Sequence, residues 1–397
     1  MNAAGTARAT WAARLVREQC FGAPAAGRPT FGAEIEFIAL DATTRAVAPI
    51  FPRNDDASTL DVVRQAGREL GWDERVSDKG VPKFVGQRGG SLTFEPGGQL
   101  EYASAVHGGL DGLVRELDAV EALLVARARD AGIELLARGV DPCNAAEGAP
   151  LQLTAGRYAK MAGYFASIGP DGARMMRQTA SLQVNIGGIS VLDRWETANA
   201  IAPLLIALFA NSARYARADT GCASYRAETW RGVDPLRTGV FCGNDAVAEY
   251  TQFALDAPAF LADADARPFG AIADAEATEL AFAAHLTTLF PEVRPRGGYL
   301  EFRSIDAVDA PRRTAALALV AAVMCDPALQ ASLPMQLPVA TEDALRAAGR
   351  RGLRDAAIRA QAETLAGLAA GALARLPASV ASEDLKERAL PELCRLA

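Results

Sequence analysis

Apolar and polar residues alternate along several short segments of this chain, which is typical of β-strands with one buried and one polar face. In the segment 34–40, Glu34 and Glu36 share a face because side chains two residues apart point the same way. Ile35 and Phe37 take the opposite face. The segments 99–104, 181–186 and 299–303 alternate in the same way, and shorter runs predict strands at 92–95 and 133–138. The pattern therefore predicts an antiparallel sheet with one apolar and one polar face.

Other segments repeat apolar residues every three or four positions, which predicts amphipathic helices. The clearest case is 110–131, where Leu113, Leu117, Val120 and Leu124 follow this spacing. Further helices are expected at 9–20, 59–70 and 194–214, and from 311 onward.

Two segments with many loop-forming residues, 86–91 and 219–243, are expected to lie outside these elements. No internal repeat or low-complexity linker divides the chain. We therefore predict the α+β class, with a single integrated catalytic domain over residues 1–397. Its sheet motifs lie within 30–310, and 311–397 forms a helical C-terminal part.

Composition narrows the class of protein. The chain holds 397 residues, half of them apolar, with a net charge of −7, which argues against a general nucleic-acid binder because phosphate binding needs a basic surface. Two histidines exclude a zinc site of the HExxH type. Six cysteines are scattered, and we find no signal-peptide pattern and no apolar run long enough to span a membrane. We expect a reduced, cytoplasmic protein with no nucleic-acid or membrane partner.

The polar faces of the predicted strands and the adjacent turn carry mostly acids and amides. They present Glu34, Glu36, Glu95, Glu101, Gln183, Asn185, Glu301 and Arg303. If these faces converge, the carboxylates repel one another, and a divalent cation such as Mg²⁺ or Mn²⁺ would relieve the repulsion. Arg303 beside the acids suits a polyphosphate. The plainer interpretation is a wet sheet face with ordinary ion pairs, but the residue types favour the metal–phosphate interpretation.

A second polar group lies in the predicted loop 219–243, which contains Arg226, Trp230, Asp234 and Arg237. Arginine and tryptophan together can hold a carboxylate-bearing substrate. The pattern alone slightly favours a surface loop with packed aromatic residues. His285 follows an apolar helical run and is more typical of a core or capping residue than of a catalyst.

Several long motifs also carry a family resemblance. They are FEPGGQLEYAS, RYAKMAGYFASIGPDGARMMRQTASLQVNIGG, ALFANS, SYRAETWRGVDPLRTG and HLTTLFPEVRPRGGYLEFRSIDA. Together they resemble the glutamate–cysteine ligase family, in the branch of plant enzymes and of bacterial enzymes of thiol and ergothioneine biosynthesis. The resemblance runs from about residue 30 to about residue 330.

The resemblance implies a glutamine-synthetase-like antiparallel sheet that binds ATP and Mg²⁺, or Mn²⁺, across its concave face. It implies that ATP phosphorylates the γ-carboxylate of glutamate, and that the amine of cysteine then displaces phosphate to give γ-glutamylcysteine. Because the acyl phosphate must be shielded from water, covering loops are expected, and 86–91 and 219–243 are the candidates.

The resemblance also implies roles for residues of the polar faces. Arg303 would bind phosphate and take part in catalysis with Glu36, and Gln183 would contact the nucleotide or a metal. The implied metal ligands are Glu34, Glu36, Glu95, Glu101 and Glu301. Arg226 would hold the glutamate carboxylate, with Trp230, Gln183 and Asn185 also in the substrate site.

The motifs indicate the chemistry more closely than the amine acceptor. Gly232 stands where the plant-like branch tends to have the first of two acids, and Asp234 keeps the second. A glutamate ligase with another amine acceptor is therefore an alternative. A catalytically silent regulatory subunit would have lost the acids, which are present here. A metal-dependent hydrolase that uses carboxylate-bound water is a further alternative.

Overall fold

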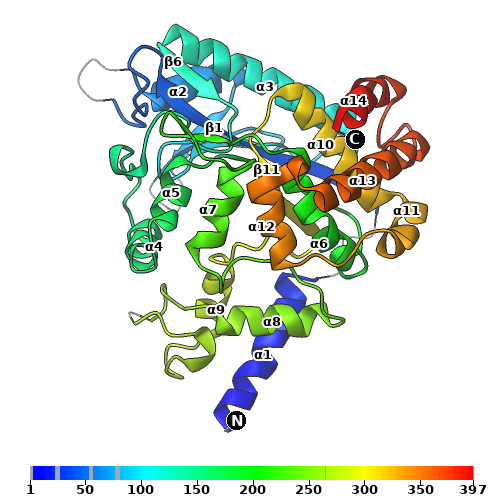
Figure 1. Cartoon of the computed structure of the whole chain (residues 1–397). Coiled ribbons are helices and arrows are strands. Elements are labelled where there is room, and N and C mark those ends of the chain that lie inside the picture. Colours follow the sequence, from blue (N-terminus) through cyan, green and yellow to red (C-terminus); the bar gives the residue numbers. More distant parts are fainter. Residues whose placement is uncertain (1–2, 23–26, 53–56, 77–80, 264, 397) are drawn as a thin grey trace.

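The structure of this chain is a computed structural model that describes residues 3–22, 27–52, 57–76, 81–263 and 265–396. Its centre is an antiparallel sheet that has nine strands among these residues. Figure 1 shows strands β1 and β11 of this sheet in the middle of the molecule. The strands follow the order β10-β11-β7-β1-β5-β4-β3-β2, and β6 pairs with the C-terminal end of β1. Their bounds are β1 (Thr30–Asp41), β2 (Asp73–Val76), β3 (Pro82–Val85), β4 (Ser91–Phe94), β5 (Leu100–Ala103), β6 (Ile133–Leu136), β7 (Ser181–Gly187), β10 (Val293–Pro295) and β11 (Tyr299–Asp306). A separate pair consists of β8 (Arg214–Tyr215) and β9 (Ala218–Asp219).

The strand register explains why polar side chains collect on one face. Residues that lie opposite each other in an antiparallel pair project to the same side of the sheet. The opposed pairs are Glu36 with Glu101, Glu34 with Gln183, and Asn185 with Glu301. The predicted alternation in these strands is confirmed.

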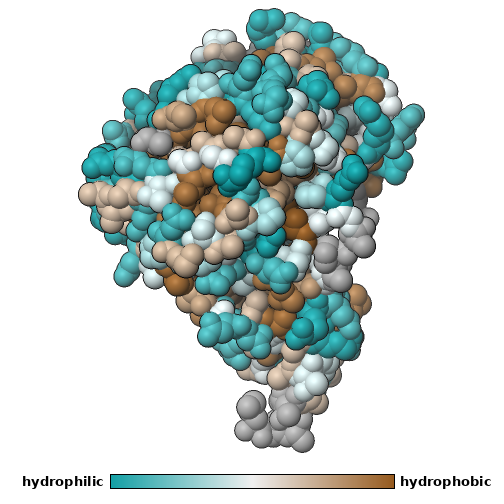
Figure 2. Space-filling view, turned by 90° about the vertical axis from the view of Figure 1, so that its right-hand side faces the viewer, coloured by the Kyte–Doolittle hydropathy of each residue, from teal (hydrophilic) through white to brown (hydrophobic). Residues whose placement is uncertain are grey.

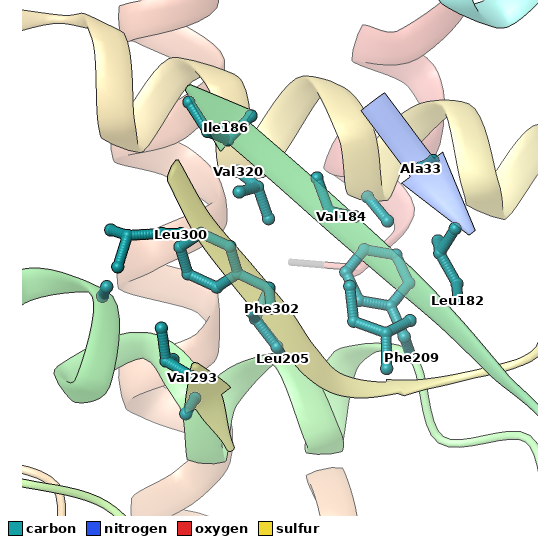
Figure 3. Packing of buried hydrophobic residues seen from close by; sticks show 14 of the residues in the cluster. Ala33, Leu182, Val184, Ile186, Leu205, Phe209, Val293, Leu300, Phe302 and Val320 are labelled. Atoms are coloured by element: carbon teal, nitrogen blue, oxygen red, sulfur yellow. The ribbon is translucent and has the colours of Figure 1, made fainter. Parts of the chain in front are cut away.

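The other face of the sheet is apolar and is covered by helices α6 (Val191–Leu208), α10 (Ala310–Cys325) and α3 (Leu110–Asp130). Figure 3 shows Val184 and Phe302 of the sheet beside Leu205 and Phe209, at the end of α6. The buried helix predicted over 194–214 is confirmed as far as Leu208, but residues 209–214 lie outside it. Because α6 and α10 are packed on most sides, their sequences are apolar all round instead of amphipathic.

Short helices cross the polar face and leave room beneath them: α4 (Arg157–Ala166), α5 (Asp171–Gln178) and α7 (Tyr225–Val233). The loop predicted over 219–243 is wrong at its centre, where α7 forms. Ser224 caps this helix by accepting a hydrogen bond from the backbone N–H of Ala227. Packing against α5 and α12 (Glu342–Arg351) buries most of its residues.

Three helices form the narrow lower end in Figure 1: α1 (Ala3–Gln19), α8 (Ala246–Asp256) and α9 (Glu279–Leu286). Trp11 of α1 packs edge-on against Phe282 of α9, with ring centroids 5.5 Å apart. Helix α2 (Thr59–Leu70) lies at the opposite end beside α3.

The C-terminal helices pack beside α10 and α6. They are α11 (Pro327–Ser332), α12, α13 (Ala356–Arg375) and α14 (Glu383–Leu396). Figure 2 shows this side of the molecule, where hydrophilic residues are interspersed with smaller hydrophobic groups. Among the described residues, no single helix is long and apolar enough to cross a membrane, and only α10 with Pro327–Met335, bent by 72°, passes that test as a pair. The predicted α+β class with a helical C-terminal part is confirmed.

Candidate active site

A cavity of about 350 Å³, here called the main cavity, lies between the polar face of the sheet and helices α4, α5 and α7. Most of the residues predicted for the site line it: Glu34, Glu36, Glu95, Glu101, Gln183, Arg226, Trp230 and Arg303. Two others lie beside it. Glu301 is bound to Arg303 at its edge, and Asn185 lines an adjoining cavity.

Four glutamates occupy the part of the main cavity over β1 and β5, here called the acidic half: Glu34, Glu36, Glu95 and Glu101. Burial, with help from nearby carboxylates, raises the pKa of Glu34 to about 7. Burial and its acidic neighbours also raise the pKa of Glu101 well above its ordinary value. Buried acids in this condition favour either protonation or a cation.

Glu36 is the best-oriented of these acids. One carboxylate oxygen accepts a hydrogen bond from the backbone N–H of Ser181 at 2.7 Å, and the other accepts one from Gln183 Nε2 at 3.1 Å. Burial raises its pKa, and Glu95 raises it further. Strand β7 therefore fixes the direction of this carboxylate.

Three arginines surround Glu301 at the other side of the site, here called the basic half. Arg294 lies 2.8 Å from the carboxylate, Arg303 is also bonded to it, and Arg296 lies 3.8 Å away. Although burial alone would raise it, these arginines lower the pKa of Glu301 to about 2. Three cations around one carboxylate leave a net positive charge that suits an anionic group.

An irregularity in β11 places Arg303. Phe302 pairs with Val184, but the next pair is Ile305 with Leu182, so β11 carries one extra residue here. Such bulges re-aim a side chain next to many active sites. Arg303 Nη1 donates to Gln183 Oε1 at 2.9 Å, which joins the basic half to the strand that orients Glu36.

Helix α7 supplies Arg226 and Trp230. The Arg226 guanidinium lies 5.0 Å from the centroid of the Trp230 ring and donates to the backbone oxygen of Arg303 at 2.8 Å. Only 4% of Arg226 is exposed, so its interpretation as a surface-loop residue is wrong. It lies 3.9 Å from Asp306, at the end of β11.

Other residues singled out in the sequence lie in the core. Asp234 and Arg237 form a buried ion pair at 3.0 Å, and Tyr164 donates to Asp234 at 2.7 Å. His285 is buried, and burial lowers its pKa to about 3, which confirms it as a core residue. The candidate lid 86–91 connects β3 to β4.

The oxygen-rich donor set suits a hard divalent cation, because Mg²⁺ and Mn²⁺ prefer carboxylate and amide oxygens. The buried Oδ1 of Asn185 has no hydrogen-bond partner among the described residues. In this conformation no group of three or more His, Cys, Asp or Glu side chains of the described chain is close enough to hold a metal ion. In charge and donor type the acidic half fits a cation, although its side chains would have to move closer together to hold one. Glu301 is neutralised by arginine.

A larger cavity, of about 1300 Å³, adjoins the main cavity, and Glu34 lines both. It follows the same face of the sheet toward the start of β1. Its lining includes Gly32, Gly187 and Gly298, and a Cβ at Gly32 would lie 3.8 Å from the Cβ of Asn185. The polar face thus presents one continuous binding region with the acids near its middle.

Comparison with known proteins decides the family. The model of glutamate–cysteine ligase family 2 matches residues 30–396. The chain belongs to this family. It is 34% identical over 331 residues to glutamate–cysteine ligase EgtA of Mycolicibacterium smegmatis, covering 76% of this chain and 75% of that protein. It is 30% identical over 270 residues to chloroplastic glutamate–cysteine ligase A of Oryza sativa subsp. indica, covering 62% and 54%.

A solved structure supports the fold of this family member. The glutamate–cysteine ligase of Francisella tularensis in complex with AMP superposes with a TM-score of 0.57 at 12% identity, over 95% of this chain and 83% of that one. At this identity the likeness concerns the fold alone. The resemblance inferred from the sequence motifs is confirmed.

Three cavity arginines of this ligase-family chain were missed in the sequence: Arg157, Arg294 and Arg296. Arg294 lies opposite Glu301 in the pair β10–β11. This pairing was not predicted because β10 is short and contains a proline. Arg157 starts α4 and makes only long contacts of 3.4 Å to Thr287, while its buried Nε has no partner among the described residues. The sequence feature that could have identified Arg157 is its place as the first residue of the motif RYAKMAGYFASIGPDGARMMRQTASLQVNIGG.

The structure also shows what surrounds Gly232, the position compared above with the plant-like branch. A Cβ at this position would lie 2.0 Å from Oδ2 of Asp171 on α5. A side chain therefore fits here only if the Asp171 carboxylate turns away.

Proposed function

We propose that this chain uses ATP to join the γ-carboxylate of glutamate to the amine of cysteine. The observation that carries this proposal is the division of one buried sheet face into an acidic and a basic half. The reaction brings a metal-bound triphosphate and a carboxylate together, so it needs both kinds of charge in one water-excluded cavity. Family membership supports the same activity.

The chemistry has two steps. First, a γ-carboxylate oxygen of glutamate attacks the γ-phosphorus of ATP, the bond to the β-phosphate oxygen breaks, and ADP leaves. Second, the amine nitrogen of cysteine attacks the carbonyl carbon of the acyl phosphate. The carbon–oxygen bond to phosphate then breaks, phosphate leaves, and the nitrogen loses a proton. The products are γ-glutamylcysteine, ADP and phosphate.

We assign the larger cavity to the nucleoside of ATP, with the triphosphate running past Glu34 toward Arg303. The volume of this cavity, about 1300 Å³, leaves room for a base and sugar. Arg303 would take up charge that develops on the transferred phosphoryl group. Its position next to Gln183 and Glu301 keeps it oriented without a bound nucleotide.

We assign Mg²⁺, or Mn²⁺, to the acidic half. Glu34, Glu36, Glu95 and Glu101 would hold it, and Glu301 would join them only if its arginines turn toward substrate. When bound, the cation neutralises the triphosphate and aligns it for transfer. Glu36 is the acid best placed to act in catalysis, because β7 fixes its carboxylate.

We assign the α-carboxylate of glutamate to Arg226, with Trp230 and Arg157 on the walls around it. Arg226 lines the same cavity as Glu36 and is held there by its bond to the backbone oxygen of Arg303. A fixed arginine there leaves the γ-carboxylate free to reach ATP.

The test is ADP release by the purified chain with ATP, Mg²⁺ and glutamate, with cysteine and then with a panel of other amines. We expect ADP release to depend on glutamate and to be matched by γ-glutamylcysteine in the mass spectrum. Glu101→Gln is the matched control and should abolish turnover. Phosphate release that needs no glutamate would indicate a hydrolase, and a stronger response to another amine would replace cysteine as the acceptor.

A further inference from the structure

A third cavity, of about 220 Å³ and here called the side cavity, lies between β10 and helices α1, α8 and α9. Thr287, Arg294 and Arg296 line both it and the main cavity, so the two adjoin along these side chains. Apart from Gln19, its remaining walls are apolar or aromatic: Cys20, Tyr250, Ala283, Leu286, Pro295 and Tyr299. The proposed reaction as assigned so far leaves this space without a ligand.

The boundary between the two cavities carries surplus positive charge. Glu301 is already bonded to Arg294 and Arg303, and Arg296 reaches it only at 3.8 Å. The Arg296 side chain keeps 41% of its surface exposed. The buried Nε of Arg294 has no partner among the described residues. Unsatisfied guanidinium donors at the mouth of a small cavity favour a carboxylate ligand.

We propose that the side cavity binds the amine acceptor and that Arg296 holds the carboxylate of that acceptor. The inference rests on the proposed function. The acceptor is then an α-amino acid, because it must present a carboxylate to the arginine and an amine to the acyl phosphate in the main cavity. The amine nitrogen attacks the acyl carbon, phosphate leaves, and one proton is released from the nitrogen.

The walls of the side cavity favour a short apolar or thiol side chain. Ala283, Leu286 and Pro295 offer no charge. Burial raises the pKa of the Cys20 thiol to about 12, so it stays neutral near pH 7. An acidic or long basic acceptor would lose hydration here without gaining an ion pair deep in the cavity.

Cysteamine provides a direct test, because it has the amine and thiol of cysteine but lacks the carboxylate. We expect wild-type protein to prefer cysteine to cysteamine in kcat/KM. Arg296→Ala should reduce that preference by about 10- to 100-fold, which is the usual worth of a charge-assisted hydrogen bond. Arg296→Lys should restore part of it, since it keeps the charge but loses the planar fork.

Arg14→Ala is the matched control. Arg14 is an exposed arginine of α1 that pairs with Glu279 of α9, beside the same helices but outside the three cavities described above. It should leave the cysteine preference unchanged. Arg296→Gln provides a second neutral variant if the alanine variant folds poorly by circular dichroism.

Hydroxylamine separates failure of this inference from failure of the proposed function. With ATP and glutamate, wild-type protein should form γ-glutamyl hydroxamate, which needs the acyl phosphate but no acceptor carboxylate. If it does and the Arg296 variants keep the full preference for cysteine, the acceptor site is wrong. An equal rise in KM for ATP and for cysteine would instead assign Arg296 to phosphate. Absence of hydroxamate in wild type would overturn the proposed function and this inference with it.

Discussion

Two glutamates on the same face of the sheet, Glu34 and Glu301, sit in opposite electrostatic surroundings. Burial raises the pKa of Glu34 to about 7, whereas arginines lower that of Glu301 to about 2. Burial therefore disfavours the charged form of Glu34, whereas the charge of Glu301 is compensated by two bonded arginines. The same substitution at the two positions therefore reports on the division of the site.

We expect Glu34→Gln to leave the free energy of unfolding of the metal-free protein unchanged or higher at neutral pH, because burial disfavours the charge that it removes. Glu301→Gln should lower it by about 3–5 kcal/mol, since it leaves buried arginines without their carboxylate. Urea unfolding of both variants measures the difference. A larger loss of stability in Glu34→Gln would contradict the assigned charges.

Arg226 is the residue on which the glutamate assignment depends. We expect Arg226→Ala to raise the KM for glutamate by about 10- to 100-fold and to lower kcat, with the KM for ATP changed much less. Because the side chain is buried, some loss of stability is also expected. Arg226→Lys, which keeps a cation, separates that loss from loss of binding. Equal effects on glutamate and ATP would refute the assignment.

At the scale of the element, hydrogen bonds join the end of β11 to the start of α7. Asp306 accepts hydrogen bonds from Ser212 Oγ at 2.6 Å, from Ser224 Oγ at 2.9 Å and from the backbone N–H of Asn211 at 2.7 Å. Ser212 in turn accepts from the backbone N–H of Arg226 at 3.1 Å. This network sets where the first turn of α7 lies.

Asp306→Asn replaces one accepting oxygen with an NH₂ group, so at least one of these bonds is lost. We expect Arg226 to shift, with a rise in the KM for glutamate that exceeds the rise for ATP, and a lower melting temperature. Steady-state kinetics with each substrate varied in turn checks this. A variant that melts earlier but keeps both KM values would show that Asp306 supports the fold and does not position Arg226.

The strands of the active-site sheet could be predicted because alternation at period two reports directly on burial. The same pattern predicted that Glu34, Glu36, Glu101 and Glu301 share a face, as the register confirms. Helix α7 could not be predicted in this way, because its burial comes from α5 and α12, which are distant in sequence. Arg294 was missed because β10 has only three residues and ends in proline, which is too short for an alternation of apolar and polar residues to be recognised.

At the scale of the whole molecule, the buried acids couple stability to pH and to cations. The pKa of Glu34 is about 7 in the folded protein against an ordinary value of 4.5. Between these values the folded protein keeps a proton that the unfolded chain has released. This contribution to stability is therefore greatest at the acidic end and is lost as the pH rises through about 7.

Mg²⁺ competes with that proton, so we expect it to raise the melting temperature more at about pH 8 than at about pH 6. Melting curves with and without Mg²⁺ at both pH values measure this. Glu34→Gln serves as the control and should weaken the pH dependence. Equal stabilisation by Mg²⁺ at both pH values in the wild-type protein would argue against a cation among these glutamates.

An oxygen label in the γ-carboxylate of glutamate tests the ligase chemistry most directly. If the carboxylate attacks ATP and the amine then displaces phosphate, one ¹⁸O atom passes from glutamate to the inorganic phosphate in each turnover. Phosphorus NMR of the reaction with cysteine should show this labelled phosphate, with ADP as the nucleotide product. Unlabelled phosphate, or release of AMP and pyrophosphate, would contradict a γ-glutamyl phosphate intermediate.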